Sequence, residues 1–207
     1  MASDAVTDPS APSRGAVPGV DEMKLIQPKR FGDDRGWFSE TYHERRYAEL
    51  GVDVVFRQDN HAYSRSAGVL RGLHFQRPPH AQAKLVRCVR GRIWDVGVDV
   101  RVGSPTYGAW RAFELSAENG CQAFVPEGFA HGYMTLEPDT EVEYKVSDFY
   151  APECEGGLIW NDPDLALPWP LAGAAPILSE KDQKLPRLSD FENPFTYDGI
   201  PLAPLDA

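Results

Sequence analysis

The chain has 207 residues, of which 42% are hydrophobic and 25% are charged, as in one well-buried globular domain or at most two small ones. Its formal net charge of −10 argues against bulk nucleic-acid binding, although a few local arginines can still hold one diphosphate. No apolar run approaches the roughly 18 residues of a membrane helix, and the N-terminus lacks the basic and apolar stretches of a secretory signal. We therefore expect neither a nucleic-acid partner nor a membrane partner.

Residues 1–22 contain almost no large apolar side chains and are predicted to form a flexible tail. From about residue 23 to 150, short β-like runs are punctuated by Gly, Pro and Asp. The predicted strands are 36–42, 54–64, 83–90, 92–100, 109–116, 131–136 and 140–147. Residues 42–50 are predicted to be helical and to end at Gly51. After residue 150 the chain is proline-rich and loop-like, with a short helix near 180–184.

Many short strands, few helices and no βαβ alternation predict an all-β fold, an antiparallel barrel or jelly roll with a few short helices. We expect one such domain over residues 23–190, followed by a C-terminal extension over 191–207. The three cysteines, Cys88, Cys121 and Cys154, form no C-x-x-C pair, which indicates reduced thiols in a cytoplasmic protein, not a disulfide framework or a zinc site.

One spaced pattern resembles the second metal-binding motif of the cupins, which are small β-barrels. Gly120, Pro126, Gly128 and His131 stand at the spacings of that motif, with Thr135 in the place of its Asn. The spacing by itself has an alternative explanation, in which the match is accidental and His131 is an ordinary core histidine bonded to a backbone carbonyl.

The first cupin motif is present only in part. Gly68 and His74 fit it, but its second His position holds Gln76 and its Glu position holds Lys84. A cupin metal site needs neutral imidazoles and a carboxylate, and a lysine ammonium beside a divalent ion is strongly unfavourable. The pattern therefore predicts a barrel that kept its cavity and lost its metal, in which a fixed cation can stabilise a developing oxyanion.

Over about residues 23–190 the chain resembles the dTDP-4-dehydrorhamnose 3,5-epimerases. The resemblance is carried by 31–40 (FGDDRGWFSE), 58–64 (QDNHAYS), 70–76 (LRGLHFQ), 83–87 (AKLVR), 126–133 (PEGFAHGY), 143–145 (EYK), 159–163 (IWNDP) and 178–182 (LSEKD). It implies a homodimer of cupin-type jelly-roll subunits without a metal or another cofactor. It also implies a dTDP-4-keto-6-deoxyhexose substrate, with inversion at C3 and C5 of dTDP-4-dehydro-6-deoxy-D-glucose to give dTDP-4-dehydro-L-rhamnose.

Epimerisation beside a ketone needs a base on one face, an acid on the other, and charge stabilisation at the ketone oxygen. His74 is the candidate base, and the resemblance pairs it with Asp182, whose carboxylate would fix the imidazole tautomer. Tyr144 matches the proton donor and shares an apolar strand face with Val142 and Val146. Lys84 is the candidate for the enolate oxygen. Without the resemblance, Asp182 and Tyr144 would be interpreted as a surface acid and a core tyrosine.

Further positions match residues of the family that contact the substrate. Four of them match positions that contact the nucleotide, partly across the dimer interface: Arg35, Glu40, Gln58 and Asn60. Arg71 matches an arginine near the substrate, and His131 is expected near the sugar. Strict alternation places Arg71 and His74 on opposite strand faces, so a bulge at Gly72 is needed to bring them together.

Three other functions remain open at this stage. A related enzyme could invert only C3 of a similar 4-keto sugar, and the residues above do not distinguish it. A non-catalytic sugar-nucleotide-binding cupin should have lost the base or the acid, and neither is missing. A metal-dependent cupin such as a dioxygenase would hold stoichiometric metal.

Overall fold

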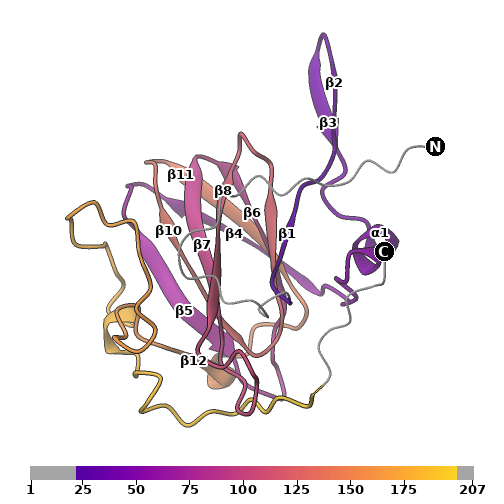
Figure 1. Cartoon of the computed structure of the whole chain (residues 1–207). Helices are drawn as coiled ribbons and strands as arrows, with labels where there is room; N and C mark the ends of the chain where they lie inside the picture. Colours follow the sequence, from indigo (N-terminus) through magenta and orange to yellow (C-terminus); the bar gives the residue numbers. More distant parts are fainter. Residues whose placement is uncertain (1–21, 200–207) are drawn as a thin grey trace.

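Two five-stranded antiparallel sheets pack face to face in the computed structural model, which describes residues 22–199 (Figure 1). The first sheet has the order β1 (Lys24–Ile26), β9 (Gln122–Val125), β6 (Lys84–Arg90), β11 (Thr140–Val146), β4 (Gln58–Ser64). The second has the order β12 (Glu155–Gly157), β5 (Leu70–Gln76), β10 (Phe129–Thr135), β7 (Arg92–Asp99), β8 (Trp110–Ser116). This is the predicted jelly roll. The predictions for residues 1–21 and 200–207 lie outside the described residues.

The apolar side chains form three clusters that account for this layering. The cluster between the two sheets contains Val86 and Val142 from the first sheet and Ile93 and Phe129 from the second. The outer face of the second sheet is covered by the chain that follows β12, including Phe195 from the expected C-terminal extension. Burial on both faces explains why strands such as β9 lack a period-two pattern, since all four of its residues are buried.

The outer face of the first sheet is covered by the segment around α1 (Glu44–Glu49), the one α-helix in residues 22–199. The helix is shorter than the predicted 42–50, and Gly51, the predicted stop, follows its C-cap Leu50 with a φ of +79° that suits a residue without a Cβ. Two short 3-10 helices, η1 (Pro152–Cys154) and η2 (Asp182–Lys184), lie in the C-terminal part of the chain. The predicted helix near 180–184 is therefore a single 3-10 turn.

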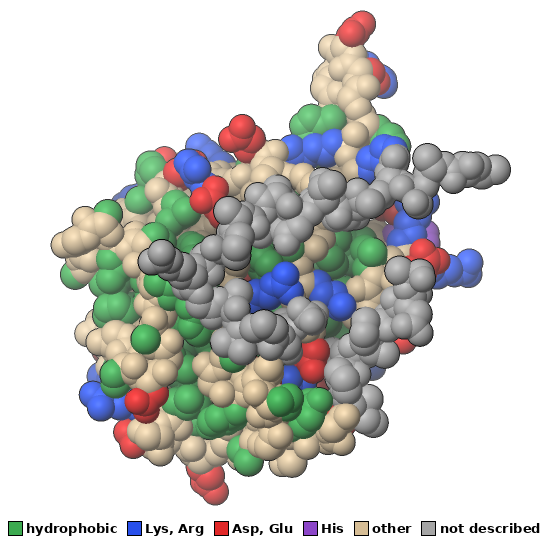
Figure 2. Space-filling model, viewed as in Figure 1, with side chains coloured by type: hydrophobic (Ala, Val, Ile, Leu, Met, Phe, Trp, Pro, Cys, Tyr) green, Lys and Arg blue, Asp and Glu red, His purple; other side chains and the backbone are tan. Residues whose placement is uncertain are grey.

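The strands β2 (Arg30–Asp33) and β3 (Gly36–Ser39) form a separate hairpin that projects from the body of the molecule (Figure 1). Charged side chains gather at its tip (Figure 2). Its strands carry Phe31, Trp37 and Phe38, which are 54%, 60% and 70% exposed. Large apolar side chains in such a position are typical of an interaction surface.

Most predicted strands agree with the structure to within a few residues. The predicted strand 54–64 starts too early, since residues 54–57 lie outside any strand, and the structure has five strands that were not predicted: β1, β2, β5, β9 and β12. Cys88, Cys121 and Cys154 are free and buried, as expected for reduced thiols. Within residues 22–199 no helix has the length and apolarity to cross a membrane.

Candidate active site

A cavity of about 270 Å³ is lined by side chains from both sheets. Its lining residues are Gln58, Asn60, His74, Phe75, Gln76, Gln82, Lys84, Tyr144, Tyr150 and Glu155. Five of the ten predicted site residues are among them: Gln58, Asn60, His74, Lys84 and Tyr144. Polar groups of several kinds therefore converge on one space, as expected of a binding or catalytic site.

The bulge expected in β5 is present at Gly72. His74 pairs with His131 and Arg71 pairs with Tyr133, so three steps along β5 are matched by two along β10. Gly72 has a φ of +132°, and a Cβ there would lie 2.5 Å from the Cα of Gly132. Only glycine fits this close approach.

The bulge changes which face each side chain of β5 occupies. Leu70 and Leu73 both belong to the cluster on the outer face, although they are three residues apart. Arg71 and His74, the residues that follow them, therefore both face the first sheet. The guanidinium of Arg71 donates to the backbone oxygen of Tyr63 at the end of β4, 3.2 Å away.

His74 is paired with Asp182, which comes from η2, more than a hundred residues further along the chain. Nε2 of His74 lies 2.6 Å from Oδ1 of Asp182, and the acid is 3% exposed. The hydroxyl of Ser179 donates to the other carboxylate oxygen at 2.8 Å and accepts from the Asp182 backbone N–H at 3.1 Å. Burial would raise the pKa of Asp182, but the bond to His74 holds it below its ordinary value.

This arrangement determines how the His74 imidazole can act. The carboxylate of Asp182 accepts a hydrogen bond only from a protonated Nε2, so Nδ1 is the ring nitrogen that can take up a proton. The imidazolium that forms is then stabilised by the adjacent negative charge.

Lys84 lies in β6 of the opposite sheet and points inward, as the strand pattern predicted. Its Nζ donates to the backbone oxygen of His74, 3.3 Å away. Burial disfavours the ammonium and lowers the pKa of Lys84 to about 8, while the charges of Asp95 and Glu155 act in the opposite direction. Most Lys84 side chains therefore remain cationic at neutral pH.

Tyr144 lies in β11 of the first sheet, where it pairs with Asn60 on one side and Val86 on the other. Burial raises the pKa of Tyr144, and the positive charge of Arg71 opposes this only in part. The phenol therefore keeps its proton at neutral pH. It faces the cavity from the sheet opposite His74, so a molecule in the cavity can meet the two groups on different sides.

His131 is buried and does not line the cavity. Its Nε2 lies 2.8 Å from Oδ2 of Asp95, a fully buried carboxylate on β7, so its partner is an acid and not the backbone carbonyl considered for a core histidine. Burial lowers the pKa of His131, because the charge of Asp95 offsets this cost only in part. Sequence reasoning missed Asp95, although an acid within the apolar run 93–98 (IWDVGV) was a visible signal.

Gln58 and Asn60 occupy neighbouring inward positions on β4. Nε2 of Gln58 donates to Oδ1 of Asn60 at 2.8 Å, and Oε1 of Gln58 accepts from the backbone N–H of Tyr150 at 3.0 Å. Tyr150 and Glu155 also line the cavity, and neither was predicted. Tyr150 lies in the loop after β11 and Glu155 begins the three-residue strand β12, and neither segment is long enough in regular structure for periodicity to predict a side-chain direction.

Arg35 and Glu40 are not brought to this cavity within one chain. Arg35 lies at the tip of the β2–β3 hairpin, where its guanidinium bonds to Asp33 at 2.5 Å and its side chain is 89% exposed. Glu40 follows the hairpin and pairs with Arg46 at 2.8 Å. Neither residue is among those that line the cavity.

Two of the positions that hold metal ligands in cupins carry residues of another kind, Gln76 and Lys84. Gln76 bonds to backbone groups and Lys84 is a cation. Residues 22–199 contain no cluster of three or more His, Cys, Asp or Glu side chains placed to bind a metal ion. A metal-free site remains a prediction that metal analysis of the purified protein can test.

The model of the dTDP-4-dehydrorhamnose 3,5-epimerase family matches residues 18–190. The chain belongs to this family. A dTDP-4-dehydrorhamnose 3,5-epimerase from Sinorhizobium fredii is 51% identical over 178 residues, which cover 86% of this chain and 91% of that relative.

Solved structures of the epimerase family share the fold. The enzyme from Bacillus anthracis, with TDP and PPi bound, is 48% identical with a TM-score of 0.79, covering 84% of this chain and 98% of that one. The enzyme from Legionella pneumophila, in complex with dTDP-4-keto-L-rhamnose, is 43% identical with a TM-score of 0.82, covering 86% and 96%.

One similar solved structure belongs to an enzyme with a different product, a monoepimerase. A 3'-monoepimerase from Streptomyces bikiniensis, in complex with dTDP-quinovose, is 35% identical with a TM-score of 0.75, and the match covers 81% of this chain and 84% of that one. The same fold therefore supports epimerisation at one carbon as well as at two.

Proposed function

We propose that this epimerase inverts C3 and C5 of dTDP-4-dehydro-6-deoxy-D-glucose, through enolate intermediates, to give dTDP-4-dehydro-L-rhamnose. The observation that carries the proposal is the meeting of three groups on one cavity: the His74–Asp182 pair, the phenol of Tyr144 and the ammonium of Lys84. These are the base, the acid and the cation that inversion beside a ketone requires.

In the proposed reaction, Nδ1 of His74 removes the proton from the carbon beside the ketone, and the electron pair moves to the ketone oxygen as the enolate forms. Asp182 holds the imidazole in the tautomer that leaves Nδ1 unprotonated and stabilises the resulting imidazolium. Lys84 stabilises the enolate oxygen. Tyr144 then donates its proton to the opposite face of the same carbon, which inverts the centre.

Each inversion leaves His74 with one proton more and Tyr144 with one proton less. The catalyst is restored when the proton on the imidazolium is lost and the phenolate regains one, so the net reaction consumes no proton and no cofactor. Repeating the sequence at the second carbon gives the doubly inverted product. The raised pKa of Tyr144 favours rapid recovery of the phenol at neutral pH.

We infer further that the protein acts as a cytoplasmic homodimer. Arg35, at the tip of the β2–β3 hairpin, and Glu40, which follows the hairpin, do not line the cavity of their own chain. The same hairpin presents the exposed side chains of Trp37 and Phe38. A second copy that accepts this hairpin would cover the apolar side chains and supply the two charged residues to the nucleotide. Gln58, Asn60, Arg71 and His131 would come from the chain that holds the sugar. Three free buried thiols favour a reducing compartment.

Proton exchange tests this function directly. The protein is incubated with dTDP-4-dehydro-6-deoxy-D-glucose in deuterated water, and NMR identifies the carbons that have gained deuterium. We expect exchange and inversion at both C3 and C5. Because a 35% identical relative is a monoepimerase, exchange at C3 alone would assign this chain to that second function.

Replacing the proposed base distinguishes a defect in catalysis from a defect in nucleotide binding. His74→Ala should abolish exchange at both carbons, while the affinity for dTDP measured by calorimetry stays within a few-fold of the unchanged protein, since His74 is assigned to the sugar end of the substrate. Near-normal turnover in this variant would show that His74 is not the base.

A further inference from the structure

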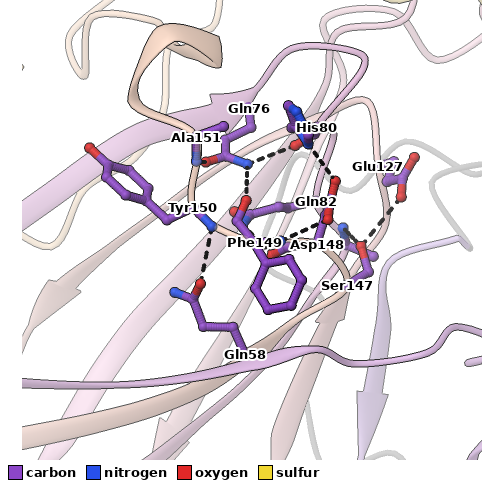
Figure 3. Close-up of polar contacts among 11 residues, drawn as sticks. Gln58, Gln76, His80, Gln82, Glu127, Ser147, Asp148, Phe149, Tyr150 and Ala151 are labelled. Carbon is purple, nitrogen blue, oxygen red and sulfur yellow. Dashed lines mark hydrogen bonds and ion pairs between the residues drawn. The ribbon is translucent and has the colours of Figure 1, made fainter.

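The chain segment that follows β11 is held by glutamine side chains from separate elements (Figure 3). Nε2 of Gln76 donates to the backbone oxygens of His80 and Phe149, at 2.7 and 3.1 Å. Oε1 of the same side chain accepts from the backbone N–H of Ala151 at 2.8 Å. One amide therefore bonds to the residues on both sides of Tyr150.

Two further glutamines complete the attachment of this segment. Nε2 of Gln82 donates to the backbone oxygen of Asp148 at 2.7 Å, and Gln58 accepts from the backbone N–H of Tyr150 at 3.0 Å. The four consecutive residues 148–151 each give one backbone group to a glutamine amide, as Figure 3 shows. A loop with this many fixed backbone groups has little freedom to shift.

Gln76 makes two of the four hydrogen bonds to residues 148–151, and of the three glutamines it is the buried one. Its side chain is only 4% exposed, and both of its polar atoms are satisfied by backbone groups. A buried amide in this condition has one favourable orientation, because turning it over would place its N–H groups against an N–H and its oxygen against carbonyls. The side chain of Tyr150, between the two clamped residues, lines the cavity.

We propose that Gln76 is a positioning residue of the epimerase, which clamps the backbone on both sides of Tyr150 and so holds that side chain in place to bind the sugar nucleotide. This proposal rests on the proposed function, since it assigns the cavity to that ligand. It also gives a role to the substitution in the first cupin motif: the position that holds a metal ligand in cupins here orders a binding loop.

The test is a double-mutant cycle on KM and kcat. The four proteins are the unchanged enzyme, Gln76→Leu, Tyr150→Ala and the double variant. Because Gln76 acts through Tyr150, Gln76→Leu should raise KM about tenfold, the effect of losing roughly one net hydrogen bond, and leave kcat within about threefold. In the Tyr150→Ala background the same change should have almost no further effect on KM.

A buried control separates positioning from general loss of stability. Thr135→Val also removes two hydrogen bonds to backbone groups, those with Val69 and Ser66, at a fully buried side chain that does not line the cavity. Its KM should be unchanged even where its Tm falls as far as that of Gln76→Leu. The proposal is wrong if the effects of Gln76→Leu and Tyr150→Ala on KM multiply, or if Thr135→Val raises KM equally.

The affinity for dTDP tests the role of Gln76 without any need for turnover of the sugar. Calorimetry with dTDP should show about tenfold weaker binding to Gln76→Leu than to the unchanged protein, and no such difference between Tyr150→Ala and the double variant. If the unchanged protein binds dTDP but fails to turn over the 4-keto sugar, the proposed function is wrong while the clamp is still judged by these affinities. Equal dTDP affinity in the unchanged protein and Gln76→Leu would refute the clamp.

Discussion

Replacing Lys84 by methionine should stabilise the fold and at the same time remove most of the activity. Lys84 is a partly buried cation between the two sheets, with one hydrogen bond to the backbone oxygen of His74. Methionine has a similar length and no charge, so Lys84→Met removes the cost of burying the ammonium with little change in packing. The same substitution removes the group assigned to the enolate oxygen.

The size of the effect follows from the pKa of Lys84. A fall of the pKa from 10.5 to about 8 on folding corresponds to an upper limit of about 3.5 kcal/mol against the charged form, at about 1.4 kcal/mol for each tenfold change in acidity. Because the side chain is only partly buried, solvent screening reduces this figure. Loss of the bond to His74 costs about 1 kcal/mol. A net gain of about 1 to 2 kcal/mol is therefore expected at pH 7.

The gain in stability from Lys84→Met should depend on pH in a defined direction. Between pH 8 and 10.5 the unfolded chain keeps the Lys84 proton while the folded chain loses it, so the penalty disappears as the pH rises through that window. The stability difference between Lys84→Met and the unchanged protein should therefore be largest below pH 8 and shrink above it. Urea unfolding at several pH values measures this difference, and contributions from other groups cancel.

Activity is measured on the same two proteins. Lys84→Met should lower kcat by about two to three orders of magnitude, the usual loss when one oxyanion donor is removed. In the unchanged enzyme, kcat/KM should fall above about pH 8 as Lys84 loses its proton. A variant that is less stable than the unchanged protein at pH 7, with a pH-independent difference and near-normal kcat, would refute the assignment of Lys84 as a buried functional cation.

Three other predictions follow from the site. Asp182→Asn should lower kcat by about two to four orders of magnitude with little change in KM, because an amide no longer fixes the His74 tautomer; an unchanged kcat would contradict the pairing. Tyr144→Phe should impair product formation yet retain deuterium exchange at the substrate carbons, since deprotonation precedes the acid's role; loss of exchange would make Tyr144 part of the proton-removing step. Trp37→Asp should shift the dimer toward monomer in sedimentation experiments and raise KM, whereas the neighbouring surface change Asp34→Ala should do neither.

The sequence by itself was sufficient for the fold class, and the residues that it shares with the family supplied the candidate catalytic groups. Short strands separated by Gly, Pro and Asp predicted the jelly roll, because a two-residue period and turn residues are local properties. The family resemblance selected His74, Lys84, Tyr144 and Asp182, and the structure brings His74 against Asp182 and directs Lys84 and Tyr144 to the same cavity. Strand alternation correctly predicted the inward direction of Lys84, because β6 pairs with β11 in unbroken register from Lys84 to Cys88.

Only the tertiary structure decided how these residues meet. The bulge at Gly72 depends on the close approach of β5 to β10, so local alternation could only suggest it for Arg71 and His74. Asp95 and Tyr150 escaped prediction because their partners come from other strands and loops, and contacts between distant segments leave no periodic trace in the chain. The amino-acid order thus determined which chemical groups are present and on which elements, whereas pairing between sheets determined their distances, their burial and their pKa values.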